Sequence, residues 1–273
     1  MIKEIAYAKI NLALEVMNKV DQYHMVNNIM IPIELHDIIE LEKSEKTYIE
    51  NDFLKDNICM KAAQLFLEKY KIKSGVKLKI IKKIPIAAGL AGGSSDAASV
   101  LKGMNKLFNI NASNQELKLL AEELGSDVPF FIDNEPSLCT NRGEKINKLI
   151  YNLESIDVIL INPNTNISTK EVYANYLYKN INKEHKINNI IDGLKHNDIL
   201  KIKNNLFNDL EEVALSLDNK LKEIFLDLIN QKVNVHVSGS GPTLFVINPE
   251  KYEKNAIFSL KNVTIIETKT VMK

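Results

Sequence analysis

A run of small residues from Pro85 to Ser99 combines the residue types and the spacing that phosphate binding requires. It reads Pro-Ile-Ala-Ala-Gly-Leu-Ala-Gly-Gly-Ser-Ser-Asp-Ala-Ala-Ser and leads directly into a helical pattern. Its glycines allow the backbone to adopt positive φ and to approach a ligand closely, and its serines offer hydroxyls where the helix begins. The first N–H groups of that helix and the positive end of its dipole form an anion site. The segment therefore predicts a phosphate cradle built on Gly89, Gly92, Gly93, Ser94 and Ser95.

An ordinary glycine-rich turn that packs a helix against a sheet is the alternative for this segment. The common nucleotide signatures do not fit it: Ser94 follows Gly93 where a P-loop has Lys, and the spacing G-x-x-G-G differs from G-x-G-x-x-G. Phosphate chemistry here would therefore need another fold. Asp96 suits the dipole of the helix, but it would repel a phosphate unless it points away or faces a metal ion.

Lys9 and Asn11 are polar residues of the first predicted strand. Because side chains alternate along a strand, these two emerge together on the face opposite the core. A solvated strand face is the alternative interpretation of the pair. The apolar residues that define the alternation are Ala6, Ala8, Ile10, Leu12, Leu14 and Val16.

Asp127 follows the end of a well-marked helix. Ser113 and Glu116 form a capping box at the start of that helix, and Gly125 is a natural C-terminal cap. The pattern places Asp127 either as an N-cap of the next turn or as a functional carboxylate held on a rigid junction.

Length, charge and cysteine content restrict the classes of protein to which the chain can belong. The chain has 273 residues, enough for one large or two medium domains, and we expect two. Its 35 basic and 35 acidic residues cancel, so it lacks the global positive field of nucleic-acid binders. No apolar stretch approaches the ~20 residues that cross a bilayer. Cys59 and Cys139 are the only cysteines, and with no leader pattern they predict a cytoplasmic protein with reduced thiols.

Further patterns predict a mixture of strands and helices. We place a domain boundary near residues 151–155, and we find no internal repeats or coiled-coil heptads. The expected strands are 33–42, 76–81, 157–162, 233–237, 244–247 and 263–270, and the expected helices include 57–70, 168–178 and 249–260.

Three segments stand in the order and spacing of a known set of motifs. They are Ala8-Lys9-Ile10-Asn11-Leu12, Pro85 to Ala98, and Val237-Ser238-Gly239-Ser240-Gly241-Pro242. Together they resemble the superfamily of small-molecule kinases that includes galactokinase, homoserine kinase, mevalonate kinase and phosphomevalonate kinase. Asp21-Gln22-Tyr23-His24 and Gly125-Ser126-Asp127-Val128-Pro129-Phe130-Phe131 are most similar to the branch that phosphorylates a cytidine diphosphate-linked methylerythritol.

The resemblance implies transfer of a phosphoryl group from ATP to the 2-hydroxyl of that alcohol, a step of isoprenoid precursor synthesis outside the mevalonate route, with Mg²⁺ as the required ion. It implies an α+β fold with an ATP-binding domain at residues 1–153 and a second domain at 154–273 that closes the substrate cleft. In this family the residues matching Lys9 and Asp127 meet at the acceptor hydroxyl. Asp127 would accept or orient its proton, and Lys9 would keep the carboxylate ionised and balance charge.

The resemblance also assigns binding positions. The glycine-rich loop would wrap the ATP phosphates, with a second segment beside the adenine, so the expected ATP-binding residues are Pro85, Ala88, Gly89, Leu90, Ala91, Gly92, Gly93, Ser94, Ser95, Asn57 and Ile58. Two aromatics and a histidine would hold the cytidine, and the expected substrate-binding residues are Asn11, Tyr23, His24, Thr169, Tyr173, Gly239, Ser240 and Gly241. No side chain is assigned to a metal ion, and Arg142, the only arginine, is left outside the site.

The chain departs from the family pattern at two places. Gln22 stands where the family has Gly, and if that position needs positive φ the change costs on the order of 1 kcal/mol or shifts the turn that carries Tyr23 and His24. Ala88 and Ala91 stand where many relatives have Gly, and close approach to a ligand is still permitted if both keep negative φ.

Three other functions are compatible with parts of the sequence. The first is the same chemistry on a different small alcohol. The second is nucleotide binding without catalysis, against which the presence of both Lys9 and Asp127 argues. The third is RNA binding, because the N-terminal fold of the superfamily is similar to part of a ribosomal protein; zero net charge and the lack of a basic stripe argue against it.

Overall fold

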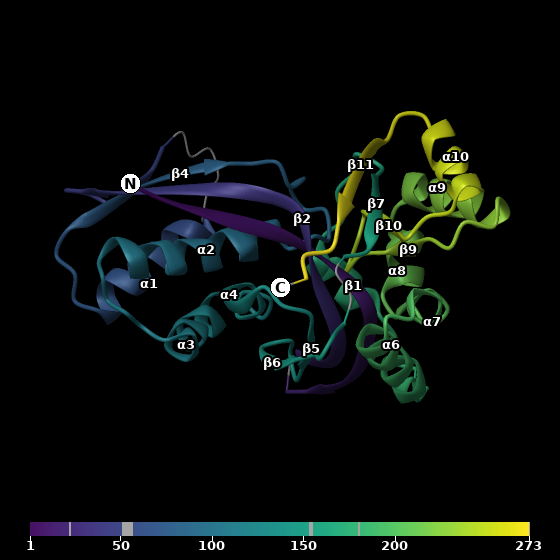
Figure 1. The fold of residues 1–273 in the computed structure, drawn as a ribbon, viewed down its shortest axis with the longest axis horizontal. Helices are drawn as coiled ribbons and strands as arrows, with labels where there is room; N and C mark the ends of the chain where they lie inside the picture. The colour runs from purple at the N-terminus through teal and green to yellow at the C-terminus, as the bar shows by residue number, and fades with distance from the viewer. Residues whose placement is uncertain (22, 51–56, 153–154, 180, 273) are drawn as a thin grey trace.

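The computed structural model describes residues 1–273 except 22, 51–56, 153–154, 180 and 273. The described residues form two sheets and ten helices, which confirms the expected α+β class. One sheet has seven strands and carries the N-terminal helices, and the other has four strands and carries the C-terminal ones (Figure 1).

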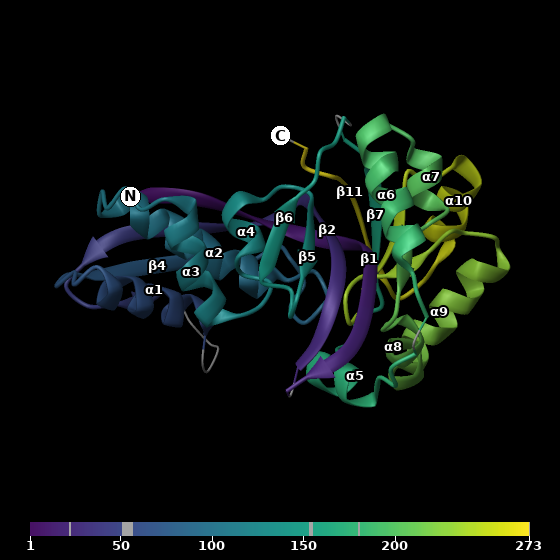
Figure 2. The same cartoon turned by 90° about the horizontal axis from the view of Figure 1, so that it is seen from below.

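Two long antiparallel strands run through the middle of the molecule (Figures 1 and 2). They are β1 (Ile2–Val20) and β2 (Tyr23–Ser44). The alternation that predicted a strand from Ala6 to Val16 is reflected in the burial of its apolar residues. Both strands extend beyond the predicted ends, because each supplies the other with ladder hydrogen bonds along its length. The pairing register shifts next to Ala8 and after Asn11, within the predicted functional face.

The seven-stranded sheet has the order β3-β4-β2-β1-β8, and β5 pairs with both β2 and β6. Its remaining strands are β3 (Tyr48–Ile49), β4 (Gly75–Ile81), β5 (Ser137–Thr140), β6 (Lys145–Lys148) and β8 (Phe207–Asn208). Four helices lie together on one side of this sheet (Figures 1 and 2): α1 (Ile58–Lys69), α2 (Gly92–Leu107), α3 (Asn114–Leu124) and α4 (Phe130–Asp133). The predicted capping box of Ser113 and Glu116 starts α3 as expected. The apolar faces of these helices and of the sheet bury Phe66, Leu101, Phe130 and their neighbours in one core.

The four-stranded sheet has the order β11-β7-β10-β9. Its strands are β7 (Asp157–Asn162), β9 (His236–Val237), β10 (Leu244–Ile247) and β11 (Thr264–Lys269). The helices of this half are α5 (Thr169–Asn175), α6 (Glu184–His196), α7 (Ile199–Lys203), α8 (Glu211–Leu217), α9 (Asn219–Asn230) and α10 (Lys251–Ser259). They gather at the right of Figure 1, apart from α5, which lies beside the far ends of β1 and β2 in Figure 2.

The two halves share structure across the predicted domain boundary. The short strand β8 pairs in parallel with β1, and Ile33 of β2 forms a bridge with Thr270. A buried cluster combines Ile10 and Ile31 of the long hairpin with Leu160 and Phe245 of the second sheet. Division into domains at residues 153 and 154 therefore remains a proposal, and those two residues lie outside the described ones.

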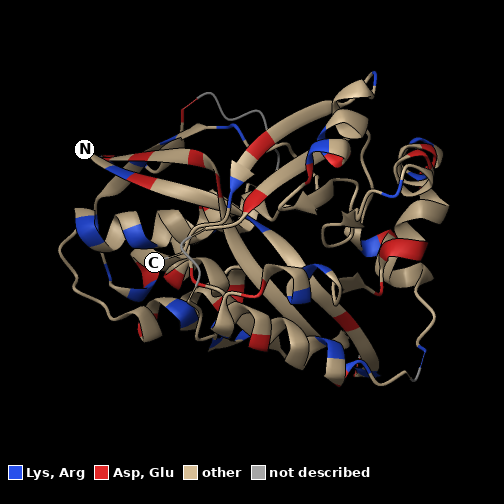
Figure 3. Ribbon diagram, turned by 45° about the vertical axis from the view of Figure 1, so that its right-hand side comes forward, with Lys and Arg blue, Asp and Glu red and all other residues tan. Residues whose placement is uncertain are grey.

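Charged side chains are distributed over the ribbon without a large region of one sign (Figure 3). No helix in the described part of the chain combines the length and the apolar character that crossing a membrane requires.

Candidate active site

The glycine-rich loop packs against the third predicted motif. Gly89 has φ +74°, and a Cβ atom there would overlap the carbonyl oxygen of Ser238 and lie 2.9 Å from that of Gly241. Ser238 in turn donates from its hydroxyl to the Gly89 carbonyl oxygen at 3.1 Å. Glycine at position 89 is therefore required twice, by the positive φ and by the close approach of a second turn.

Helix α2 begins at Gly92, and its N-cap is Ala91 rather than a serine. Ala91 has φ +55°, so the condition of negative φ is not met at this residue, whereas Ala88 is absent from the positive-φ residues. The left-handed conformation costs an alanine roughly 1–2 kcal/mol, and the close packing of the loop holds it there. Ser94 and Ser95 lie in the first turn of α2, and the buried Ser95 hydroxyl has no hydrogen-bond partner among the described residues.

The segment expected beside the adenine lies next to this helix start. Asn57 caps α1 by accepting a hydrogen bond from the Cys59 amide at 3.0 Å. A Cβ atom at Gly93 would lie 3.8 Å from the Cγ2 atom of Ile58. The structure therefore brings Asn57 and Ile58 to the loop, as the assignment of both to ATP binding requires.

Lys9 and Asn11 do not form a solvated strand face, because each is only 3% exposed. The Lys9 ammonium donates to the Gly89 carbonyl oxygen at 2.6 Å and to Asn11 Oδ1 at 2.7 Å. The Asn11 amide donates to Asn28 Oδ1 at 2.7 Å. The first motif is thus bonded directly to the loop of the second motif, and the alternative of a solvated face is wrong.

Asp127 lies in the turn before α4 and is half-buried. Its negative charge raises the pKa of Lys9, although burial has the larger and opposite effect and lowers that pKa to about 8. No ion pair or hydrogen bond joins the Asp127 carboxylate to another described residue. The carboxylate is therefore close enough to act on the Lys9 ammonium and still free to accept a bond from a hydroxyl.

The buried Cys139 thiol lies in the same electrostatic environment. Burial and the charge of Asp127 both raise its pKa, and Lys9 opposes this. The thiol therefore remains protonated and does not act as a nucleophile.

The third motif is a tight turn between β9 and β10. Gly239 has φ +58°, and a Cβ atom there would lie 3.0 Å from Lys9 Nζ. The Asn208 side-chain amide fixes the turn by donating to the carbonyl oxygens of Val237 and Gly239, at 2.7 Å each. Ser240 shares a hydrogen bond of 2.8 Å with the hydroxyl of Thr169 at the start of α5. Four of the predicted substrate-binding residues, Thr169, Gly239, Ser240 and Gly241, therefore adjoin one another.

His24 and Tyr173 also come together. Their ring centroids are 6.0 Å apart, and Tyr176 packs edge-on against His24 at 5.6 Å. One ring nitrogen of His24 bonds the Met17 carbonyl oxygen at 2.9 Å, and the other, Nε2, is buried without a partner among the described residues. Burial and then the charge of Asp127 raise the pKa of Tyr173, which places this aromatic within electrostatic reach of the carboxylate.

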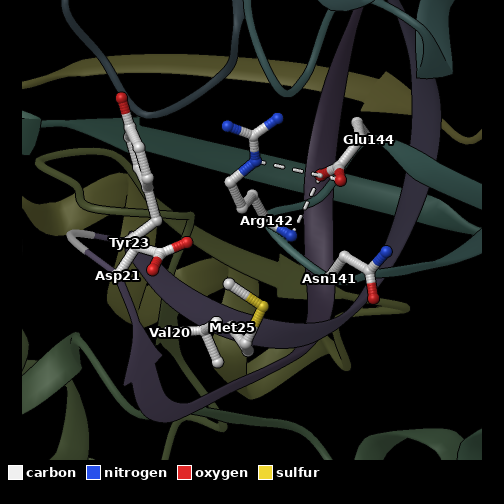
Figure 4. Close-up of a pocket in the computed structure, with 7 residues that line it drawn as sticks. All are labelled: Val20, Asp21, Tyr23, Met25, Asn141, Arg142 and Glu144. Carbon is white, nitrogen blue, oxygen red and sulfur yellow. Dashed lines mark hydrogen bonds and ion pairs between the residues drawn. The ribbon is translucent and has the colours of Figure 1, made fainter.

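Tyr23 lies apart from this pair and is 58% exposed. Its ring faces Arg142, whose guanidinium carbon is 5.1 Å from the ring centroid. The residue expected to distort this turn, Gln22, lies outside the described residues. A cavity of about 400 Å³ opens between the tip of the long hairpin and the turn after β5 (Figure 4), and it is lined by Val20, Asp21, Tyr23, Met25, Asn141, Arg142 and Glu144.

Sequence reasoning left Arg142 out of the site. The structure places it beside the hairpin, because the Val26 amide donates to the Asn141 carbonyl oxygen at 2.6 Å and so joins the turn after β5 to the hairpin. The Glu144 carboxylate accepts a hydrogen bond from the backbone amide of Arg142 at 2.9 Å and lies 3.8 Å from the Nε atom of the Arg142 side chain (Figure 4). The terminal NH₂ groups of the guanidinium are therefore not engaged by Glu144. The only sequence signal is that this is the sole arginine of the chain.

We expect Gly89→Ala to lower the free energy of unfolding by about 3 kcal/mol, because the new Cβ adds both left-handed strain and a steric overlap with the turn at Ser238. Gly93→Ala is the matched control, since its Cβ has room. Helix propensity predicts an unchanged or slightly higher stability for that control. Urea denaturation of both variants measures the difference, and equal stabilities would contradict the packing described for Gly89.

Comparison with known proteins agrees with this geometry. Residues 57–135 match the model of the GHMP kinases N terminal domain. A 4-diphosphocytidyl-2-C-methyl-D-erythritol kinase of Clostridium beijerinckii is 42% identical over 252 residues, which cover 89% of each chain. The enzyme of the same name from Clostridium botulinum strain Alaska E43 is 39% identical over 287 residues, covering 97% of this chain and 99% of that protein.

Solved structures give the same result. A crystal structure of 4-(cytidine 5'-diphospho)-2C-methyl-D-erythritol kinase superposes with a TM-score of 0.82 at 26% identity and covers 99% of this chain and all of the other. Homoserine kinase from Cytophaga hutchinsonii superposes with a TM-score of 0.72 at 17% identity, covering 99% of this chain and 94% of the other, and it shows the shared fold. The chain therefore belongs to the 4-diphosphocytidyl-2-C-methyl-D-erythritol kinases, a family of the GHMP kinases.

Proposed function

We propose that this chain transfers the γ-phosphoryl group of ATP to the 2-hydroxyl of 4-diphosphocytidyl-2-C-methyl-D-erythritol, a step of non-mevalonate isoprenoid precursor synthesis. The chain is a kinase by family, and GHMP kinases use ATP as the phosphoryl donor. The observation that carries the residue assignment is the position of the Lys9 ammonium, bonded to the glycine-rich loop and within electrostatic reach of Asp127.

The proposed chemistry consists mainly of positioning and charge. Asp127 accepts the proton of the acceptor hydroxyl as that oxygen attacks the γ-phosphorus of ATP. Lys9 balances the charge of the carboxylate and the negative charge that develops on the transferring group. Its bond to the Gly89 carbonyl oxygen fixes the ammonium relative to the loop that holds the donor. Phosphoryl transfer requires little covalent participation of the protein, so the contribution of these two side chains is positioning and charge.

The donor would lie along the loop and the start of α2. The free N–H groups and the dipole of that helix favour the phosphate charges, and the segment at Asn57 and Ile58 adjoins them. The residues that we assign to this half are Pro85, Ala88, Gly89, Leu90, Ala91, Gly92, Gly93, Ser94, Ser95, Asn57 and Ile58.

The site also fits a Mg²⁺ ion that accompanies the nucleotide. The buried Ser95 hydroxyl has no partner among the described residues, and an oxygen of this kind is a ligand that Mg²⁺ prefers. The described residues contain no group of three His, Cys, Asp or Glu side chains that could hold a metal alone. Ser95 would therefore share the ion with phosphate oxygens and water, and the bound ion would neutralise part of the phosphate charge.

We assign the acceptor to the opposite side of Lys9. Asn11, Thr169 and the turn from Gly239 to Gly241 would contact the methylerythritol and its phosphates. His24 and Tyr173 would hold the cytidine, because the His24 Nε2 atom lacks a partner among the described residues and can bond a pyrimidine edge. The face of Tyr23 and the Arg142 guanidinium extend this half of the site.

We expect Arg142→Ala to raise the KM for the cytidine-linked acceptor about fivefold and to leave the KM for ATP unchanged. The factor corresponds to about 1 kcal/mol, the strength of the cation–π contact that we propose holds the guanidinium and the Tyr23 ring in place for the acceptor. Steady-state kinetics with each substrate varied in turn measures both constants. Arg142→Lys is the control that retains the charge and should recover part of the affinity, whereas an unchanged acceptor KM in Arg142→Ala would remove this residue from the site.

The acceptor is tested by measuring ADP release with three alcohols, namely the cytidine-linked methylerythritol, homoserine and mevalonate. We expect kcat/KM for the first to exceed the others by at least about 10³, because only that acceptor fills the cytidine half of the site. Turnover of homoserine or mevalonate alone would be compatible with the phosphoryl-transfer mechanism but would exclude a role in non-mevalonate isoprenoid precursor synthesis. Nucleotide binding without turnover of any alcohol would favour a non-catalytic protein.

A further inference from the structure

A buried ionic cluster lies behind the glycine-rich loop and has no part in the chemistry proposed above. Lys82 Nζ lies 2.5 Å from Asp37 Oδ2 and 2.7 Å from Asp96 Oδ2. Asp37 is 0% exposed and Asp96 is 3% exposed, whereas the Lys82 side chain is about one-third exposed. The three residues come from β2, from the segment after β4 and from the first turns of α2, so one ammonium connects three elements.

The cluster holds both ends of the loop. Asp37 Oδ1 accepts the amides of Lys83 and Ile84, at 2.5 Å and 2.8 Å, and these residues directly precede the loop at Pro85. The other end of the loop leads into α2, where Asp96 accepts a hydrogen bond from Lys82. A Cβ atom at Gly92 would lie 3.3 Å from Lys82 Nζ, so the ammonium lies directly against the start of the helix.

The cluster sets one ammonium against two buried carboxylates. Among the described residues, Lys82 is the only cation within ion-pair distance of either carboxylate. Without the ammonium, two buried carboxylates would lie without a cation behind a site that must bind polyphosphate. A buried carboxylate that loses its cation is strongly unfavourable.

We propose that Lys82 is a positioning residue for the phosphoryl donor, which holds the beginning of the glycine-rich loop and the first turns of α2 in one geometry through Asp37 and Asp96. Asp96, which the sequence marked as a repulsive residue beside phosphates, is neutralised by Lys82 and becomes one of the two anchors. The inference rests on the proposed function only in that ATP is the ligand of the loop.

The test compares Lys82→Met with Lys79→Met, a matched replacement three residues earlier. Lys79 makes only an exposed contact of 3.6 Å with Glu40. Calorimetric titration with a non-hydrolysable ATP analogue gives the nucleotide Kd without turnover, so the outcome is independent of the identity of the acceptor. We expect Kd to rise at least about tenfold in Lys82→Met and to stay within twofold of wild type in Lys79→Met.

Steady-state kinetics and two further variants separate positioning from a general loss of structure. We expect the KM for ATP to rise and the KM for the acceptor to stay within twofold, and Lys82→Arg to restore most of the nucleotide affinity. If Lys82→Met does not fold, the double variant Lys82→Met/Asp96→Asn replaces it, because it removes one of the two carboxylates left without a cation. Its nucleotide Kd should still rise, since no ammonium then connects β2 to α2. An unchanged nucleotide Kd in a folded variant, or equal loss of affinity for donor and acceptor, would overturn the proposal.

Discussion

Replacement of Asp127 by Ala should lower kcat by at least about 10² while the protein stays folded. The carboxylate is half-buried and has no hydrogen-bond partner among the described residues, so its removal leaves no donor unsatisfied. Its loss removes the group that accepts the proton of the attacking hydroxyl, and one acid-base group contributes about 10² to 10⁴ in rate. Steady-state kinetics with saturating ATP and cytidine-linked acceptor measures the effect on kcat directly.

The matched control is Asp227→Ala, which removes an exposed carboxylate on α9, a helix that carries no residue assigned to the site. Its kcat should equal that of wild type. Thermal unfolding of both variants excludes a loss of structure as the cause. Near-normal turnover in a folded Asp127→Ala protein would contradict the role of this carboxylate.

Lys9→Met should show the second large effect, a fall in kcat of at least about 10² together with higher stability at pH 7. Burial lowers the pKa of Lys9 from 10.5 to about 8, so keeping the ammonium charged in the folded state costs on the order of 3 kcal/mol. Met fills a similar volume without that cost. The Gly89 and Asn11 oxygens lose a donor, and the single proton of the nearby Ser238 hydroxyl can serve only one of them, so we expect a net gain of about 1–2 kcal/mol.

The sign of the pH dependence follows from the direction of this shift. The folded state binds the Lys9 proton less tightly than the unfolded state, so wild-type stability rises as pH increases from about 8 to 10.5. The advantage of Lys9→Met should therefore shrink over that interval, and wild-type kcat should fall above pH 8 as the ammonium is lost. Urea denaturation at pH 7 and pH 10 measures the first effect. A variant that is less stable than wild type at pH 7 would show that Lys9 stabilises the fold.

The sequence predicted those features that depend on local patterns. Alternation along β1 placed Lys9 and Asn11 on one face, and the capping box and the glycines marked the start of α3 and the phosphate loop. Motif order then indicated which segments meet. The structure brings the three motifs together through bonds of Lys9 and Ser238 to the Gly89 carbonyl oxygen, a contact that spans most of the chain.

The features that sequence could not provide are contacts between distant elements. The pairing of Asp96 with Lys82, and of Tyr23 with Arg142, depends on how β2, β4, α2 and the turn after β5 pack. The positive φ of Ala91 is likewise set by the close packing of the loop, against the intrinsic preference of alanine. Intrinsic preferences and spacing carry no information on such tertiary constraints.

Phosphorus NMR of the reaction of ATP with 4-diphosphocytidyl-2-C-methyl-D-erythritol tests the proposed function most directly. We predict one new phosphomonoester signal, formed in equal amount with ADP and without splitting by protons, because carbon 2 of the methylerythritol carries a methyl group and no hydrogen. The signal should be absent when Asp127→Ala replaces the wild-type protein over the same period. Formation of ADP without this phosphomonoester, or an equal yield of it from Asp127→Ala, would contradict the proposed reaction and its assignment to Lys9 and Asp127.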